Sequence, residues 1–278
     1  MTKFADSLQD ISVSKKSLLT IGLDPDPDKM PVSDVFEFCK LIIDHTEGFT
    51  AAYKPNLGFF EAFGLEGLKS LEKVIDHVKS NYSDVLIIGD AKRGDIAPTS
   101  SKYAYAMFEI WDFDAVTVNA FSGLDSIEPF LRYTDRGVFV WCKSSNPDGY
   151  QLQDLIVKGT ADRKIYQVIA EYCVSWNIEG NLGLVVGATY PEELKIVRDI
   201  AGELPILVPG IGSQSGDLEA SVRAGLGREK HGLLVSSSRG IIYASSDRNN
   251  FGSAAANTAA NLRENINNIL EDLGRSFI

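Results

Sequence analysis

The chain has 278 residues, 44% of them hydrophobic, and it carries 27 Lys and Arg against 38 Asp and Glu, a formal net charge of −11. This hydrophobic content is enough for a full core and argues against a disordered chain. The acidity argues against nucleic-acid polymers and anionic membrane surfaces as partners, because both bind basic patches. The three cysteines, Cys39, Cys142 and Cys173, form no CxxC pair, so neither a disulfide scaffold nor a zinc ribbon fits, and all three are expected in the core.

The sequence contains no pattern typical of a signal peptide, a membrane span or a histidine-rich metal site. The N-terminus, MTKFADSLQD, has an acidic residue where a signal peptide needs its apolar stretch. The longest apolar runs, such as residues 182–188, are only long enough for a strand. The three histidines, His45, His77 and His231, lie far apart. We therefore expect a cytoplasmic protein with no metal ion.

Short, continuous apolar runs recur along the chain, and each is typical of a strand buried on both faces of a parallel sheet. In chain order they are residues 18–23, 49–53, 85–89, 115–120, 137–142, 182–188, 205–208 and 232–235. Between them, apolar residues repeat every three or four positions. This spacing predicts helices around 65–78, after residue 98, from Pro191 onward and around 262–270.

Strict alternation of strands and helices is compatible with a doubly wound sheet or with a (β/α)8 barrel. Eight units in 278 residues give roughly 35 residues per unit, a normal length. No linker or change of composition divides the chain, which favours an α/β fold with one (β/α)8 barrel domain over residues 1–278 and no fused second domain. The longest irregular stretch, residues 144–160, is expected to be a functional loop.

Charged residues follow the second and third apolar runs, where a barrel places its active site. Because side chains alternate along a strand, Asp90 and Lys92 should both point into the barrel mouth, and Lys54 and Asp95 would complete a cluster of alternating charges. A protonated lysine beside a carboxylate suits a reaction in which an anionic group leaves and a carbanion is protonated. A salt-bridge network that closes the barrel top is the structural alternative.

Two segments near the C-terminus predict a phosphate site. The glycine-rich residues 209–216 and residues 236–240 follow the seventh and eighth runs, and in barrel enzymes these two loops commonly hold a phosphate. Glycine lets backbone N–H groups approach an anion, and Arg239 can donate two parallel hydrogen bonds to it. Ordinary tight turns with a surface arginine are the alternative.

Seven segments, in order along nearly the whole chain, match one family pattern. They are GLD at 22–24, YKPN at 53–56, DAKRGDI at 90–96, SNP at 145–147, VGAT at 186–189, PGIGSQ at 209–214 and SRG at 238–240. On these motifs the chain resembles the orotidine 5′-phosphate decarboxylase family, in its longer bacterial-type branch. One difference is the serine run 236–238, because the shorter members have glycine next to the arginine.

The resemblance implies decarboxylation of orotidine 5′-phosphate to UMP without a cofactor, in pyrimidine biosynthesis. By resemblance, Lys92 is the acid that protonates C6, Asp90 destabilises the substrate carboxylate, and Lys54 bridges Asp90 and the ribose. It also implies a homodimer in which Asp95 and Thr99 enter the site of the other subunit.

The remaining residues that the resemblance assigns bind the substrate away from the reacting carbon. They are Asp24 for a ribose hydroxyl, Ser145 for the pyrimidine, Gln214 between pyrimidine and phosphate, and Arg239 and Gly240 for the phosphate. Asn119 and Pro209, near the ends of the fourth and seventh apolar runs, are further candidate contacts.

Three other functions remain open from the sequence. A related decarboxylase or aldolase of a sugar phosphate would use a similar Asp-Lys-Asp strand but bind magnesium. An aldolase could form a Schiff base at Lys54 or Lys92. A barrel that only binds nucleotides is the third, although it would not need the charged strand ends.

Overall fold

A closed barrel of parallel strands forms the centre of the molecule in the computed structural model, which describes residues 4–159, 161–211 and 217–277. The strands are paired in the order β1-β10-β9-β8-β5-β4-β3-β2, and β2 pairs with β1 to close the ring. They are β1 (Leu19–Leu23), β2 (Ala52–Pro55), β3 (Leu86–Arg93), β4 (Ala115–Val118), β5 (Gly137–Lys143), β8 (Leu182–Val186), β9 (Ile206–Pro209) and β10 (Leu233–Ser237). The predicted (β/α)8 barrel is therefore confirmed, and each apolar run overlaps one of these strands.

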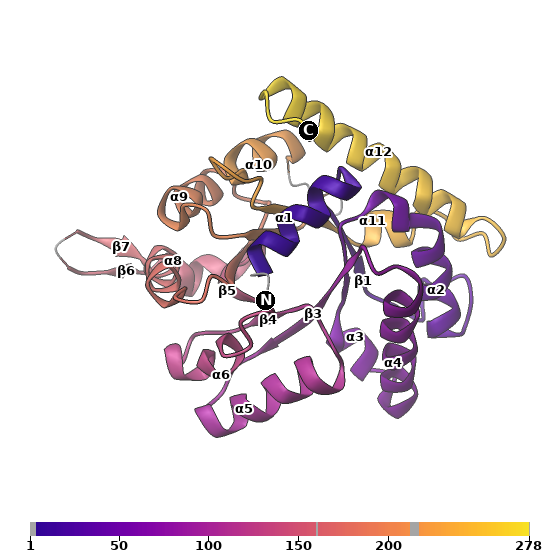
Figure 1. Cartoon of the computed structure of the whole chain (residues 1–278), viewed down its shortest axis with the longest axis horizontal. Helices are drawn as coiled ribbons and strands as arrows, with labels where there is room; N and C mark the ends of the chain where they lie inside the picture. The colour runs from indigo at the N-terminus through magenta and orange to yellow at the C-terminus, as the bar shows by residue number, and fades with distance from the viewer. Residues whose placement is uncertain (1–3, 160, 212–216, 278) are drawn as a thin grey trace.

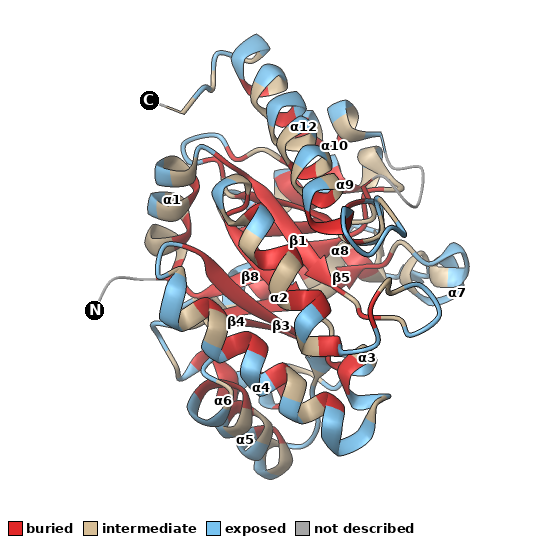
Figure 2. Cartoon of the chain, turned by 90° about the vertical axis from the view of Figure 1, so that its right-hand side faces the viewer, coloured by how far each residue is buried: buried red, intermediate tan, exposed pale blue. Residues whose placement is uncertain are grey.

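Helices follow every barrel strand and cover the outside of the barrel. The described α-helices are α1 (Phe4–Lys15), α2 (Val35–Thr46), α3 (Leu57–Glu61), α4 (Gly64–Asn81), α5 (Ala97–Tyr105), α6 (Glu128–Leu131), α7 (Tyr150–Gln153), α8 (Ile165–Trp176), α9 (Pro191–Ala201), α10 (Leu218–Gly225), α11 (Arg239–Ile242) and α12 (Phe251–Asp272). Figure 2 shows buried strands surrounded by helices whose outer faces are exposed. None of the helices in the described ranges is long and apolar enough to cross a membrane.

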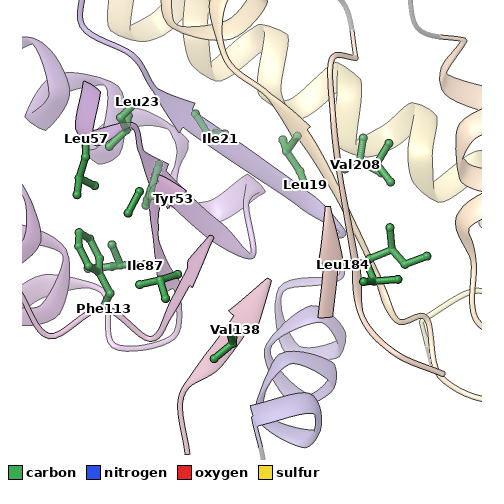
Figure 3. Packing of buried hydrophobic residues seen from close by; sticks show 14 of the residues in the cluster. Leu19, Ile21, Leu23, Tyr53, Leu57, Ile87, Phe113, Val138, Leu184 and Val208 are labelled. Carbon is green, nitrogen blue, oxygen red and sulfur yellow. The ribbon is translucent and has the colours of Figure 1, made fainter. Parts of the chain in front are cut away.

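The core has two layers, because strand side chains alternate between the two faces of the barrel wall. The larger layer lies between strands and helices and includes Ile21, Tyr53, Ile87 and Val208 (Figure 3). The three cysteines are buried and unpaired in it, as expected. The smaller layer fills the barrel interior. Its members are Phe4, Leu8, Ala51, Ala52, Leu86, Ile88, Ala115, Phe139, Val185, Leu207 and Leu234.

Helix α1 covers the amino-terminal end of the barrel and was not predicted from the sequence. In Figure 1 it lies across the middle of the ring of helices. Phe4 and Leu8 pack into the interior layer, and the Phe4 ring meets the Phe139 ring edge-on at 5.9 Å. This end of the barrel is therefore filled by side chains from outside the strand–helix units.

The segment after β5 is more regular than predicted. Residues 144–160 were expected to be irregular, but they contain a 3₁₀ turn (Pro147–Gly149), α7 and β6 (Ile156–Val157). Strand β6 pairs antiparallel with β7 (Arg163–Lys164), and this hairpin projects to the left of the barrel in Figure 1. Thr160 itself lies outside the described residues. Strand β6 is exposed and β7 is half-buried, and neither two-residue strand has an apolar run buried on both faces, which is why the sequence did not indicate them.

Candidate active site

A cavity of about 240 Å³ opens at the carboxyl ends of the barrel strands. Its floor is apolar, from Trp141, Val185 and Leu207, and its wall is polar. Seven of the residues predicted for the site line it: Asp24, Lys54, Asp90, Lys92, Ser145, Pro209 and Arg239.

The Asp90 carboxylate lies between two lysine ammonium groups. Lys54 Nζ donates to Asp90 Oδ2 at 2.6 Å, and Lys92 Nζ donates to Asp90 Oδ1 at 2.6 Å. Lys54 and Asp90 are buried, with side chains 7% and 9% exposed, whereas the Lys92 side chain is 40% exposed. The charged side chains at the ends of β2 and β3 thus form one array, which we call the charge array. Lys92 is its most exposed member and faces the cavity opening.

This arrangement keeps Asp90 and Lys54 ionised. Burial alone would raise the pKa of Asp90, but Lys54 and Lys92 outweigh burial and hold that pKa well below its usual range. Burial alone would lower the pKa of Lys54, but the charges of Asp90 and Asp24 outweigh it, so the pKa of Lys54 is raised. The site therefore presents the Asp90 carboxylate paired with the Lys54 ammonium at neutral pH.

Thr117, at the end of β4, completes the array and was not among the predicted site residues. Its hydroxyl donates to Asp90 Oδ1 at 2.9 Å and accepts a hydrogen bond from the backbone N–H of Lys92 at 3.1 Å. Thr117 lies near the end of the fourth apolar run, but its side chain is neutral, so the pattern of charges gave it no role. Only its place on the strand beside β3 indicates a role.

Lys92 departs from regular strand geometry. It has a φ of 45°, in the left-handed region, and the pairing of β3 with β4 shifts register between Gly89 and Arg93. A residue other than glycine in this region costs roughly 1–2 kcal/mol. Asp90 and Lys92 do meet, as predicted, but a bulged strand end brings them together instead of simple alternation.

The ribose-side candidate Asp24 lies between the ends of β1 and β10. Its Oδ2 accepts a hydrogen bond from the Ser238 hydroxyl at 2.6 Å. Its Oδ1 is buried and has no hydrogen-bond partner among the described residues. Asp24 also contributes to the electrostatic environment of Lys54.

On the predicted phosphate side, Pro209 at the end of β9 and Arg239 at the start of α11 line the cavity. Gly240 is exposed and does not line it. Gln214 lies outside the described residues.

At the end of β5, the predicted Ser145 lies beside two polar residues that the sequence did not assign. Lys143 and Ser144 line the same cavity. The Lys143 side chain is 3% exposed and pairs with Asp154, which follows α7. The backbone N–H of Ser144 donates to the Gln153 side chain at 3.0 Å. These contacts attach the segment after β5 to the barrel rim.

Besides Gly240, three predicted residues lie apart from this cavity. Asp95 is exposed, accepts a hydrogen bond from the backbone N–H of Ile96 at 2.7 Å, and pairs with no lysine within the described chain. The expected four-charge cluster thus has only three members in one chain. Thr99 lies on α5 and does not line the cavity. Asn119 lines a neighbouring, mostly apolar cavity of about 500 Å³ that shares Trp141, Ser144 and Asn146 with the first.

Metal ligands are scarce at this site. Across the described ranges, no group of three or more His, Cys, Asp or Glu side chains is placed to hold a metal ion.

Residues 17–253 match the model of the orotidine 5′-phosphate decarboxylase / HUMPS family. The chain belongs to this family. It is 45% identical over 258 residues to an orotidine 5′-phosphate decarboxylase of Cupriavidus necator, covering 90% of this chain and 93% of that protein. It is 43% identical to the Ralstonia pickettii enzyme of the same name, covering 95% and 98%. The predicted family is therefore confirmed.

Solved structures agree with this assignment. The chain is similar to Leishmania donovani OMP decarboxylase, with a TM-score of 0.83 and 41% identity, covering 96% of this chain and 98% of that one. It also matches Leishmania donovani UMP synthase, with a TM-score of 0.86 and 42% identity, covering 97% of this chain but only 57% of that one.

Proposed function

We propose that this chain removes CO2 from orotidine 5′-phosphate to form UMP, without a cofactor, in the pyrimidine biosynthesis of the cytoplasm. The observation that carries the proposal is the Asp90 carboxylate held between Lys54 and Lys92 at the cavity. The named relatives at 43–45% identity support the choice of substrate.

In the proposed reaction, the substrate carboxylate lies against Asp90 and the pyrimidine C6 lies at Lys92. The bond from C6 to the carboxylate breaks, CO2 leaves, and the electron pair stays on C6. Lys92 Nζ then donates its proton to C6 and later regains one from water. The negative charge of Asp90 disfavours the bound carboxylate, whereas the Lys92 ammonium favours the carbanion, so fixed charges lower the barrier.

The other cavity residues would hold the nucleotide. Asp24 and Lys54 would contact the ribose and Ser145 the pyrimidine. The phosphate would lie against Pro209 and Arg239. Because the phosphate is remote from C6, its binding energy can be used to order the site for the reaction. Gly240 and Gln214 remain proposed contacts on the family pattern alone, and Asn119 on its place after the fourth apolar run.

We further propose that the protein acts as a homodimer in which Asp95 and Thr99 complete the partner's site. In support, Asp95 is exposed and has no lysine partner among the described residues of its own chain. The adjacent Ile96 is 63% exposed, an unusual position for an apolar side chain unless another surface covers it.

The activity test follows the loss of orotidylate absorbance with purified protein. The wild type should release CO2 in the presence of EDTA, whereas magnesium-dependent activity on a sugar phosphate alone would contradict the proposal. Lys92→Ala should abolish turnover but still bind UMP. Lys195→Ala, at a lysine 65% exposed on α9, is the matched control and should retain full turnover.

A mixing test checks the dimer. Lys92→Ala and Asp95→Ala should each be inactive alone. A mixed dimer would hold one site with both changes and one intact site, so mixing should restore about a quarter of wild-type activity. No recovery in a solution that contains mixed dimers would exclude a shared site.

A further inference from the structure

The serine run 236–238 before Arg239 differs from the shorter members of the family, which have glycine next to the arginine, and its last member contacts Asp24 on the ribose side of the cavity. Ser238 lines the cavity and directly precedes α11, which begins with Arg239. Ser238 therefore stands between the proposed phosphate contact and the proposed ribose contact.

The Ser238 hydroxyl holds the Asp24 carboxylate. Ser238 Oγ lies 2.6 Å from Asp24 Oδ2 and 3.2 Å from the carbonyl oxygen of Gly22, so its proton goes chiefly to the carboxylate. Hydrogen bonds to a charged acceptor are about twice as strong as neutral ones. This contact joins residues 214 positions apart in the chain.

No second hydrogen bond fixes this carboxylate. Asp24 Oδ1 is buried without a donor among the described residues, so the orientation of the side chain depends on Ser238. Without that hydrogen bond, the attraction of the Lys54 ammonium would draw the carboxylate toward Lys54 and change its orientation.

The backbone around Asp24 is built to admit Ser238. A Cβ added at Gly22 would lie 2.7 Å from Ser238 Cβ, closer than real carbon atoms approach, so glycine is required opposite this serine. Tyr243, just after α11, holds the same loop from its other side. Its hydroxyl donates to the Asp24 carbonyl oxygen at 2.7 Å and accepts from the Asp26 N–H at 2.7 Å.

We propose that Ser238 is a positioning residue that orients the Asp24 carboxylate to accept a ribose hydroxyl, and that it thereby determines selectivity for ribonucleotides over deoxyribonucleotides. A carboxylate oxygen has room for more than one donor, so Oδ2 can accept from Ser238 and from the ligand together. This inference rests on the proposed function, because it takes a uridine nucleotide as the ligand.

The test measures the dissociation constants of UMP, 2′-deoxy-UMP and 3′-deoxy-UMP by calorimetry. The selectivity ratio is the larger deoxynucleotide constant divided by that of UMP. A hydrogen bond to a charged group sets the wild-type ratio at about 10- to 100-fold. Ser238→Ala should reduce the ratio at least fivefold, and Ser238→Gly should do the same if the alanine variant does not fold.

Two further variants isolate the contact. Ser237→Ala removes a neighbouring buried hydroxyl that donates to the Ile211 carbonyl oxygen, and it should leave the ratio unchanged. Asp24→Asn should bring the ratio close to one, and adding Ser238→Ala to it should cause no further change.

The outcomes separate the two proposals. The role of Ser238 would be overturned if Ser238→Ala kept the selectivity ratio of the wild type, or if Ser237→Ala lowered that ratio as much as Ser238→Ala does. If the wild type itself had a selectivity ratio near one and decarboxylated orotidylate normally, the role of Ser238 would also be overturned, but the proposed function would stand. Failure of the wild type to bind UMP and to decarboxylate orotidylate would overturn the proposed function itself.

Discussion

Replacement of Thr117 by valine gives a direct test of how the charge array is held. Thr117 is 1% exposed, and valine has the same shape with a methyl group in place of the hydroxyl. The change removes the donor to Asp90 Oδ1 and the acceptor for the Lys92 N–H, and it moves no charge.

The expected magnitude follows from those two hydrogen bonds. A hydrogen bond to a carboxylate contributes about 1.5–3 kcal/mol and a neutral one about 1 kcal/mol. The free energy of unfolding should therefore fall by about 2–4 kcal/mol. Because Lys92 would lose the contact that holds its left-handed backbone, its ammonium would shift, and misplacement of a reacting group by about 1 Å can cost about 100-fold in rate. We expect kcat on orotidylate to fall between tenfold and 100-fold.

The assay compares kcat, KM and the urea midpoint of the wild type, Thr117→Val and Thr117→Ser. Serine retains the hydroxyl and loses only the methyl group, so its kcat should stay within about threefold of the wild type despite lower stability. The reasoning about the hydroxyl would be refuted if the kcat of Thr117→Val equalled that of the wild type. It would also be refuted if Thr117→Ser and Thr117→Val lowered kcat equally.

Further predictions concern the phosphate side, the barrel end and the dependence of stability on pH. Arg239→Ala should lower kcat as well as raise KM in steady-state kinetics, and a change in KM alone would contradict the use of phosphate binding energy. Phe4→Ala should lower the free energy of unfolding by about 3 kcal/mol in urea titrations and leave KM unchanged, since the cavity it creates is at the far barrel end. Burial alone would raise the pKa of Asp44, but hydrogen bonds from Lys40, His77 and Tyr82 lower it below 3.8. Because the folded pKa is the lower one, the stabilisation is present at neutral pH and is lost as the pH falls below about 3.8. Asp44→Asn should therefore be less stable than the wild type at neutral pH, and equal differences in urea midpoint at neutral pH and at about pH 3 would contradict this.

The barrel could be predicted because each strand is a continuous apolar run, and strands such as β1 and β8 are buried along their whole length. Helix α1 could not be predicted in the same way. Its fully buried apolar residues are Phe4 and Leu8, and their partners come from strands spread over the rest of the chain. A local pattern cannot indicate a helix whose packing surface exists only once the barrel has closed.

The same limit applies to the candidate site. Lys54, Asp90 and Lys92 could be predicted because a buried charge at a strand end requires a partner. Thr117 is neutral, and the left-handed backbone of Lys92 depends on a bulge that no spacing indicates. The hydrogen bond from Ser238 to Asp24 depends on β10 lying beside β1, which follows from ring closure and not from either segment alone.

The covered end of the barrel has a practical consequence for experiments on this protein. Helix α1 and the chain after α12 lie together at that end, where His231 contacts both Gln9 and the carbonyl oxygen of Arg275. Ligands therefore exchange at the opposite end, where CO2 and UMP would share one exit and UMP would compete directly with substrate. An affinity tag or a surface linker attached at either terminus would point away from that exit, so immobilised protein should retain its turnover.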